Sequence, residues 1–207
     1  MRNLVMICVF VIGFSSHAEA KKVEGKIIRR TGTETVIFNV PFKLLSSRPD
    51  IERMQYRIRY YDKFGKKMIL KPGEAEEIQF AYKNEVVRMI SISNDLGLQG
   101  TFSRSTFVFL RLEIDGPLRL FKYYQTSSNN TGYYGAGIST GGGTYTTENL
   151  YLQKEGQKLK RPRTLNFRKD MADYLSDCPA LVDRIRDKDF KRKDLEFIVM
   201  FYNKQCQ

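Results

Sequence analysis

The sequence predicts an α+β protein, in which an antiparallel β-sandwich or partly open barrel precedes a C-terminal helical cap of about three helices. Apolar and polar residues alternate with period two as far as about Lys160, which is typical of strands with one buried face. Turn sequences such as Asp115-Gly116 separate the alternating segments. After Arg163 the apolar residues recur at helical spacing. We therefore divide the 207 residues into 1–20, 21–163 and 164–207.

The first segment, residues 1–20, has the pattern of a secretory signal peptide. An apolar run of eleven residues, 4–14, follows Arg2, and the small residues Ala18 and Ala20 supply a cleavage site. Eleven residues at helical rise are too short to cross a hydrocarbon core of about 30 Å. We expect cleavage after Ala20 and export of a chain that begins at Lys21.

The second segment, residues 21–163, contains eight to ten expected strands. Tyr56, Ile58 and Tyr60 alternate with arginines, and similar alternation recurs along the segment. Short hairpin turns at the predicted spacing favour an antiparallel sheet over a parallel one. The expected strands are 23–30, 35–40, 54–61, 66–70, 75–82, 86–93, 107–114, 117–124, 149–154 and 157–161.

Residues 127–149 form a segment rich in glycine and tyrosine. A phosphate-binding glycine loop lies between a strand and a helix and usually carries a lysine. Here the glycines lie between two expected strands, and no basic residue occurs between Lys122 and Lys154. We interpret the segment as a long hairpin loop. Tyr133, Tyr134 and Tyr145 either bind a sugar or a protein partner, or belong to a loop without a binding role.

The third segment, residues 164–207, predicts three helices. The first spans 166–178, with Asn166 available as its N-cap. Pro179 is well placed to begin the second helix. The third opens at Asp194 and carries apolar side chains on more than one face, so we expect it to be largely buried.

Two cysteines remain after the leader, and both lie in the helical segment. Cys178 ends the first expected helix and Cys206 ends the apolar stripe of the third, so antiparallel packing brings them together. Export permits oxidation. We predict a Cys178–Cys206 disulfide, the alternative being two separate buried thiols.

The residue inventory excludes several chemistries. The only histidine, His17, lies in the leader, so the exported chain has no imidazole base and no histidine-ligated metal. We predict no metal and no cofactor. Glycoside hydrolysis by paired carboxyl groups remains open, although neighbouring basic residues also fit an ordinary solvated surface. The candidate acids are Asp170, Asp173 and Asp177 in one cluster and Glu74, Glu76 and Glu77 in another.

The chain carries a formal charge of +12, which favours acidic partners. Export makes nucleic acid an unexpected ligand. Residues 154–169 hold seven basic side chains and one acidic one, and either bind an acidic polymer, lipid or protein, or protect a charged edge strand from aggregation. The candidate binding residues are Lys154, Lys158, Lys160, Arg161, Arg163, Arg168 and Lys169.

Four segments together cover most of residues 106–207: IDGPLRLFKYY, NLYLQKEG, NFRKDMADYLSDCPALVDRI and DLEFIVMFYNKQC. Their succession resembles a family of exported envelope proteins from Bacteroidetes-type bacteria whose activity is not known. It implies a β-rich region before a short helical segment, and a Gram-negative envelope setting. It implies no site residues.

These observations together predict an exported, non-enzymatic protein of the periplasm or outer-membrane face that binds a protein or an acidic envelope polymer. One alternative is a glycan hydrolase that works through carboxylates without histidine. The other is a cationic protein that binds a membrane or lipopolysaccharide surface. The oligomeric state stays open.

Overall fold

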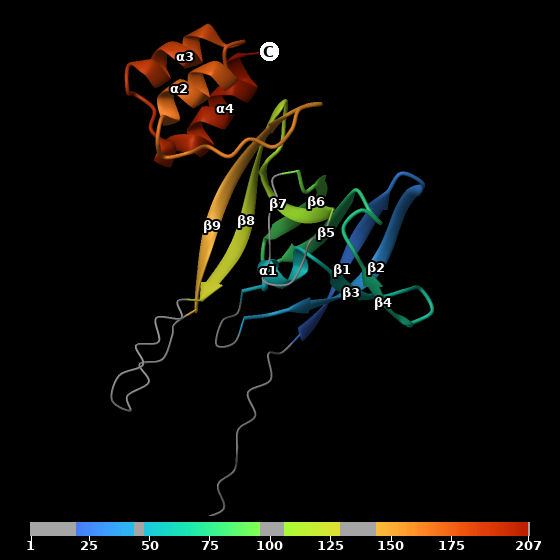
Figure 1. The fold of residues 1–207 in the computed structure, drawn as a ribbon. Coiled ribbons are helices and arrows are strands. Elements are labelled where there is room, and N and C mark those ends of the chain that lie inside the picture. The colour runs from blue at the N-terminus through green and yellow to red at the C-terminus, as the bar shows by residue number, and fades with distance from the viewer. Residues whose placement is uncertain (1–19, 44–47, 96–105, 129–143, 207) are drawn as a thin grey trace, which may run out of the picture.

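The computed structural model describes residues 20–43, 48–95, 106–128 and 144–206. Within these ranges nine strands form one open antiparallel sheet, in the order β4-β3-β2-β1-β5-β6-β7-β8-β9 (Figure 1). The predicted α+β class, with its antiparallel sheet and C-terminal helices, is confirmed. The strands are β1 (Ala20–Arg29), β2 (Gly32–Pro41), β3 (Ile58–Tyr61), β4 (Lys67–Leu70), β5 (Glu77–Tyr82), β6 (Glu85–Ser93), β7 (Phe107–Ile114), β8 (Leu118–Ser128) and β9 (Thr144–Lys154).

The largest core lies on the inner face of β1 to β6. Every second residue of these strands points inward, as the period-two alternation predicts. Phe38 of β2 and Phe80 of β5 meet edge to face there, with ring centroids 6.3 Å apart. The short helix α1 (Ile51–Met54) contributes Ile51 and Met54 to the same cluster. The opposite face of these strands is therefore left to polar and partly exposed side chains.

Gln55, directly after α1, joins β7 to β8 where these strands are not paired with each other. Direct pairing of β7 with β8 runs only from Arg111 to Ile114. Beyond it, the Gln55 carbonyl accepts a hydrogen bond from the Phe109 N–H at 2.9 Å. The Gln55 side-chain amide donates to the Tyr124 carbonyl at 2.8 Å and accepts from the Tyr124 N–H at 2.6 Å. The fully buried Gln55 thus supplies the hydrogen-bond partners that a neighbouring strand would otherwise provide to Phe109 and Tyr124.

The helical region packs against one end of the β8–β9 hairpin, away from β1 to β4 (Figure 1). It consists of α2 (Phe167–Tyr174), α3 (Pro179–Arg186), the 3₁₀ turn η1 (Arg192–Asp194) and α4 (Leu195–Gln205). Leu118, Leu120 and Leu152 supply the sheet side of this interface. The Cys178–Cys206 disulfide is present, with Cα atoms 5.3 Å apart. It ties the start of α3 to the end of α4.

Asn203 of α4 repeats the bonding pattern of Gln55 at Leu118, the first residue of β8. Its side-chain oxygen accepts from the Leu118 N–H at 2.9 Å, and its amide nitrogen donates to the Leu118 carbonyl at 2.9 Å. A third, longer bond reaches the Asp115 carbonyl at 3.4 Å. Strand β8 is therefore held at Leu118 and at Tyr124 by side-chain amides that replace backbone partners.

Several local expectations were wrong. Residues 54–57 continue α1 and a turn, so β3 begins only at Ile58. Residues 157–161 form no strand, and one bridge from Leu152 to Lys160 replaces it. Asn166 precedes α2 in a left-handed conformation and makes no side-chain cap. On α4, Phe197 is 63 % exposed and Met200 is exposed too, so this helix is not buried on all sides.

No helix in the described ranges is long and apolar enough to cross a membrane.

Candidate functional site

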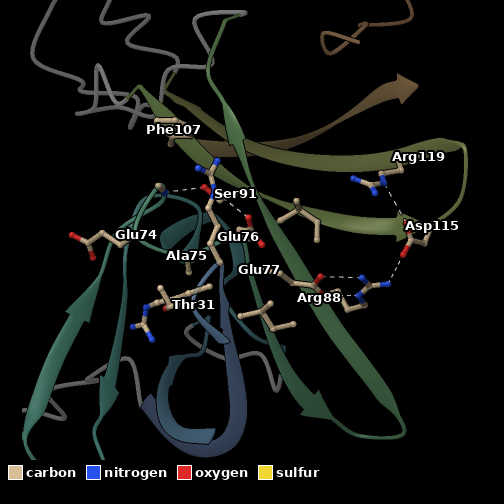
Figure 2. Close-up of a pocket in the computed structure, with 15 residues that line it drawn as sticks. Thr31, Glu74, Ala75, Glu76, Glu77, Arg88, Ser91, Phe107, Asp115 and Arg119 are labelled. Carbon is tan, nitrogen blue, oxygen red and sulfur yellow. Dashed lines mark hydrogen bonds and ion pairs between the residues drawn. The ribbon is translucent and has the colours of Figure 1, made fainter. Parts of the chain in front are cut away.

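An open pocket of about 730 Å³ lies between the β1–β2 turn, the segment before β5, and the β7–β8 turn (Figure 2). It brings the acids Glu74, Glu76 and Glu77, which the sequence marked as candidates, together with Asp115. Four arginines line the same space: Arg29, Arg30, Arg88 and Arg119. The pocket therefore mixes both charges.

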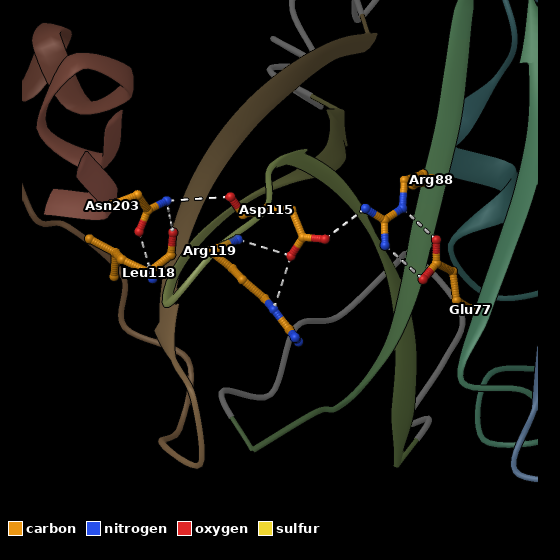
Figure 3. A network of polar contacts seen from close by, with 7 residues as sticks. Glu77, Arg88, Asp115, Leu118, Arg119 and Asn203 are labelled. Carbon is orange, nitrogen blue, oxygen red and sulfur yellow. Dashed lines mark hydrogen bonds and ion pairs between the residues drawn. The ribbon is translucent and has the colours of Figure 1, made fainter. Parts of the chain in front are cut away.

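An ion-pair network crosses the pocket wall from β5 to the β7–β8 turn (Figure 3). Arg88 holds both oxygens of Glu77, with its Nε at 2.6 Å and its Nη2 at 3.0 Å. Its Nη1 donates to Asp115 at 2.7 Å, and Arg119 Nε approaches the other Asp115 oxygen at 3.4 Å. Every donor nitrogen of Arg88 is thus used within the protein, which makes the network a structural link between β5, β6 and the turn.

The electrostatics of this pocket do not suit general acid catalysis. Partial burial raises the pKa of Asp115, but hydrogen bonds from Arg88 and from the Gly116 N–H outweigh it, and the net pKa is lowered. A glycosidase acid needs a raised pKa. Glu76 is 3.3 Å from Arg30, and Glu74 accepts the Lys71 N–H at 2.9 Å.

The second acidic cluster is dispersed by the fold. Helix α2 ends at Tyr174, so Asp177 lies beyond it and shares no helical face with Asp170 and Asp173. Asp177 accepts hydrogen bonds from Lys154 Nζ and from the Tyr202 hydroxyl, both at 2.6 Å. Burial raises the pKa of Asp177, but these two bonds lower it further than burial raises it. This carboxylate anchors the helical region to β9.

Several basic side chains of the predicted binding segment, residues 154–169, make contacts within the protein. The Lys154 side chain is only 11 % exposed, and its ammonium lies 5.2 Å from the ring centres of both Tyr174 and Tyr202. Arg161 donates to the Asn149 side chain at 2.8 Å. Lys160 lies 6.0 Å from the Tyr174 ring.

The remaining members of the segment are exposed and do not converge on one site. Lys158 and Arg163 lie in the connection to the helices. Arg168 and Lys169 line a small pocket of about 280 Å³ on the helical region, together with Arg186 and Asp173. The segment therefore spreads over two parts of the protein.

Among the predicted tyrosines, Tyr145 lies on β9 and is 47 % exposed. Tyr133 and Tyr134 lie outside the described residues. The glycine- and tyrosine-rich loop is shorter than the sequence predicts. Strands β8 and β9 pair residue for residue from Leu118↔Lys154 to Ser128↔Thr144, and so include residues 127, 128 and 144–149.

A second basic surface, which sequence reasoning missed, lies on the outer face of β1 to β4. Lys22 and Lys26 of β1, Arg59 of β3 and Lys67 of β4 alternate with the inward core residues and are exposed. We call these four residues the cationic face. Cross-strand pairing of Lys22 with Asn39, of Asn39 with Arg59, and of Tyr61 with Lys67 places three of them side by side on one face. Lys26 lies on the same face, four residues further along β1.

The cations of this face are not neutralised by the protein. In the described parts of the chain no ion pair involves any of the four. Lys22 instead lies 4.9 Å from the centre of the Tyr61 ring. Glu24 of β1 is the one acidic side chain that alternation places between them. A simple count signals this surface, because residues 21–71 hold 14 basic and 5 acidic residues.

No group of three potential metal ligands occurs among the residues that the structure describes.

Comparisons with protein-family models, with curated proteins and with solved structures found no match.

Proposed function

We propose that the protein is an exported, non-enzymatic component of the cell envelope that binds an acidic partner through the cationic face. The observation that carries the proposal is that four exposed basic side chains share one sheet face and have no ion-pair partner among the described residues. Unpaired cations on a common surface attract phosphate, sulfate or carboxylate groups. The envelope setting rests on the signal-peptide pattern and on the family resemblance.

The state of the acids supports a binding role over a hydrolytic one. In the pocket of Figure 2, Glu77 and Asp115 are both bonded to Arg88. A carboxylate held by a guanidinium is stabilised in its charged form, so it is a poor proton donor at neutral pH. The pocket is also open to solvent, whereas hydrolases with paired carboxyl groups hold the sugar in a cleft between them.

The proposal is tested by reversing the charge of the cationic face. The protein is expressed from its full sequence, so that residues 1–20 are processed as in the cell, and its binding to soluble dextran sulfate is measured by calorimetry at several salt concentrations. The variant Lys22→Glu/Arg59→Glu/Lys67→Glu should bind at least about tenfold more weakly, at roughly 1 kcal/mol per contacting charge. Its salt dependence should also flatten, because fewer counterions are exchanged.

The matched control is Lys158→Glu/Arg163→Glu/Lys169→Glu, which changes the net charge by the same amount on the other basic region. Its affinity should fall by less than about threefold, because a charge far from the contact is screened by salt. Equal losses in the two triple variants would mean that net charge, and not the cationic face, sets the binding. The proposal would then be withdrawn.

A further inference from the structure

The turn between β3 and β4 carries an aromatic side chain that faces solvent. Phe64 is 83 % exposed, whereas six of the ten other phenylalanines that the structure describes are buried. It lies between Lys63 and Lys66, and the Lys63 ammonium is 5.0 Å from its ring centre. Exposing a phenylalanine forgoes the free energy of its burial. A single exposed apolar side chain is common on protein surfaces, so Phe64 suggests a contact site only through the exposed apolar and basic residues beside it.

The turn is held in one conformation by Asp62. Its side-chain oxygen accepts the N–H groups of Phe64 and Lys66, both at 2.9 Å. Its carbonyl accepts the Gly65 N–H at 2.9 Å, and its own N–H donates to the Lys66 carbonyl at 3.0 Å. Gly65 has a φ of +76°, which suits glycine. The Asp62 carboxylate is thus used within the turn, and Phe64 is presented outward by a defined scaffold.

The β3–β4 turn lies next to the cationic face. Lys67 follows the turn directly and pairs with Tyr61 across the hairpin. Ile69 of β4, 49 % exposed, and Ile37 of β2, 37 % exposed, point to the same outer face as Lys67 and Arg59. Apolar side chains are therefore interspersed with the cations and project from the same end of the sheet.

We propose that the β3–β4 hairpin inserts Phe64 into the interfacial layer of a bilayer that contains anionic lipids, while the cationic face contacts the headgroups. This inference rests on the proposed function and specifies its partner. A water-soluble polyanion would use the cations but would leave Phe64, Ile37 and Ile69 in water. A bilayer interface takes up both kinds of group, because apolar side chains enter the acyl boundary while lysine and arginine stay at the phosphates.

The sequence offers a direct reporter for this insertion, because the chain contains no tryptophan. The variant F64W places a single indole at the tip, and its emission should shift to the blue when vesicles of phosphatidylcholine with phosphatidylglycerol are added. Vesicles of phosphatidylcholine alone should give a much smaller shift. The control F197W places the indole on α4, at a phenylalanine that is 63 % exposed, and should give no shift.

Affinity provides the second readout. Phe64→Ser should weaken binding to the anionic vesicles about tenfold, and should leave binding to dextran sulfate within about twofold of the wild type. Phe197→Ser should change neither. Because both substituted side chains are exposed in the folded protein, the circular dichroism and the unfolding midpoints of the two serine variants should match those of the wild type.

The outcomes separate this inference from the proposed function. If F64W gives no blue shift and Phe64→Ser binds vesicles normally, while the triple variant of the cationic face still loses dextran sulfate binding, insertion is rejected and the polyanion site stands. If the triple variant binds dextran sulfate as its control does, the proposed function fails and membrane docking by this face fails with it. A blue shift for F197W and none for F64W would place the helical region at the bilayer and reject the hairpin.

Discussion

Several basic residues at the two ends of the sheet differ in their surroundings, although Arg29 of β1 is paired with Glu34 of β2 at 2.7 Å. At the β8–β9 end, Lys122 lies 3.4 Å from Glu113 and 3.5 Å from Glu148, and Lys154 is bonded to Asp177. At the β1–β4 end, Lys22 and Arg59 have no such partner among the described residues. Lys154 stabilises the attachment of the helices, Lys122 links β8 to its neighbouring strands, and Lys22 and Arg59 remain available for a ligand. The role of a cation therefore depends on whether the fold brings an acid beside it.

The strongest test of this comparison removes the covalent link at the helical end. Cys178 and Cys206 are 28 positions apart, and their bond restricts the unfolded chain. Cys178→Ala/Cys206→Ala should lower the free energy of unfolding by about 3 to 4 kcal/mol. Urea unfolding followed by circular dichroism measures this loss.

The same double variant should leave dextran sulfate binding unchanged, because the cationic face lies on other strands. A parallel loss of polyanion affinity would show that the two ends of the sheet are coupled. Titration of the denatured, unreduced wild type should find no free thiol at these positions; two reactive thiols there would contradict the bond.

The next largest effect concerns the amide that joins β7 to β8. Gln55→Ala leaves the N–H and the carbonyl of Tyr124 buried without their partner, which should cost about 2 to 3 kcal/mol of unfolding free energy. Hydrogen exchange of the Tyr124 amide should accelerate by the factor that corresponds to this loss of free energy.

The matched control is Gln79→Ala on the outer face of β5, where Glu77 is the one side-chain partner of Gln79 among the residues that the structure describes. Its cost should stay below about 0.5 kcal/mol. An equally small loss for Gln55→Ala would mean that water replaces the amide and that β8 does not depend on α1.

The smallest expected effects are pH-dependent and belong to the anchor between β9 and the helices. Burial and the bond to Asp177 raise the pKa of Tyr202 to about 12. The stability from this bond is present below the unfolded-state pKa of about 10, and is lost as pH rises from about 10 to about 12. Tyr202→Phe should therefore lose less stability than the wild type across this alkaline range, as thermal unfolding in matched buffers would measure.

The acid side of the same anchor has the opposite sign. The pKa of Asp177 lies below its ordinary value, so its stabilisation is present at neutral pH and disappears as pH falls through the folded-state pKa. Asp177→Asn should cost less than about 1 kcal/mol at pH 7, because this carboxylate is half exposed, and the difference from wild type should vanish in strong acid. A difference that persists there would assign the loss to packing.

Much of the fold was predictable because the decisive signals are local. Alternation marked β7 at its observed bounds, and Pro179 marked the start of α3. The cysteines could be paired because each stands at a helix terminus in a short segment. The errors arose where tertiary contacts override local pattern: residues 54–57 alternate like a strand, yet Gln55 is taken into the gap between β7 and β8.

The candidate site was less predictable. Residues 154–169 are the densest basic run, but the count did not reveal that Lys154 meets Asp177, which lies 23 positions later in the chain. The cationic face draws its members from three strands, so no short window contains it. Glu77 and Asp115 likewise stand apart in the sequence, and only Arg88 between them makes them one network.

The sequence by itself determined most of the strands, the positions of the helices, the cysteine pair and the excess of positive charge, because each follows from composition or from spacing along the chain. Only the tertiary structure decided which cations are neutralised and which acids are held by arginine. The physical reason is that Coulomb and hydrogen-bond energies depend on distances of a few ångströms between residues that strand order, not sequence order, brings together.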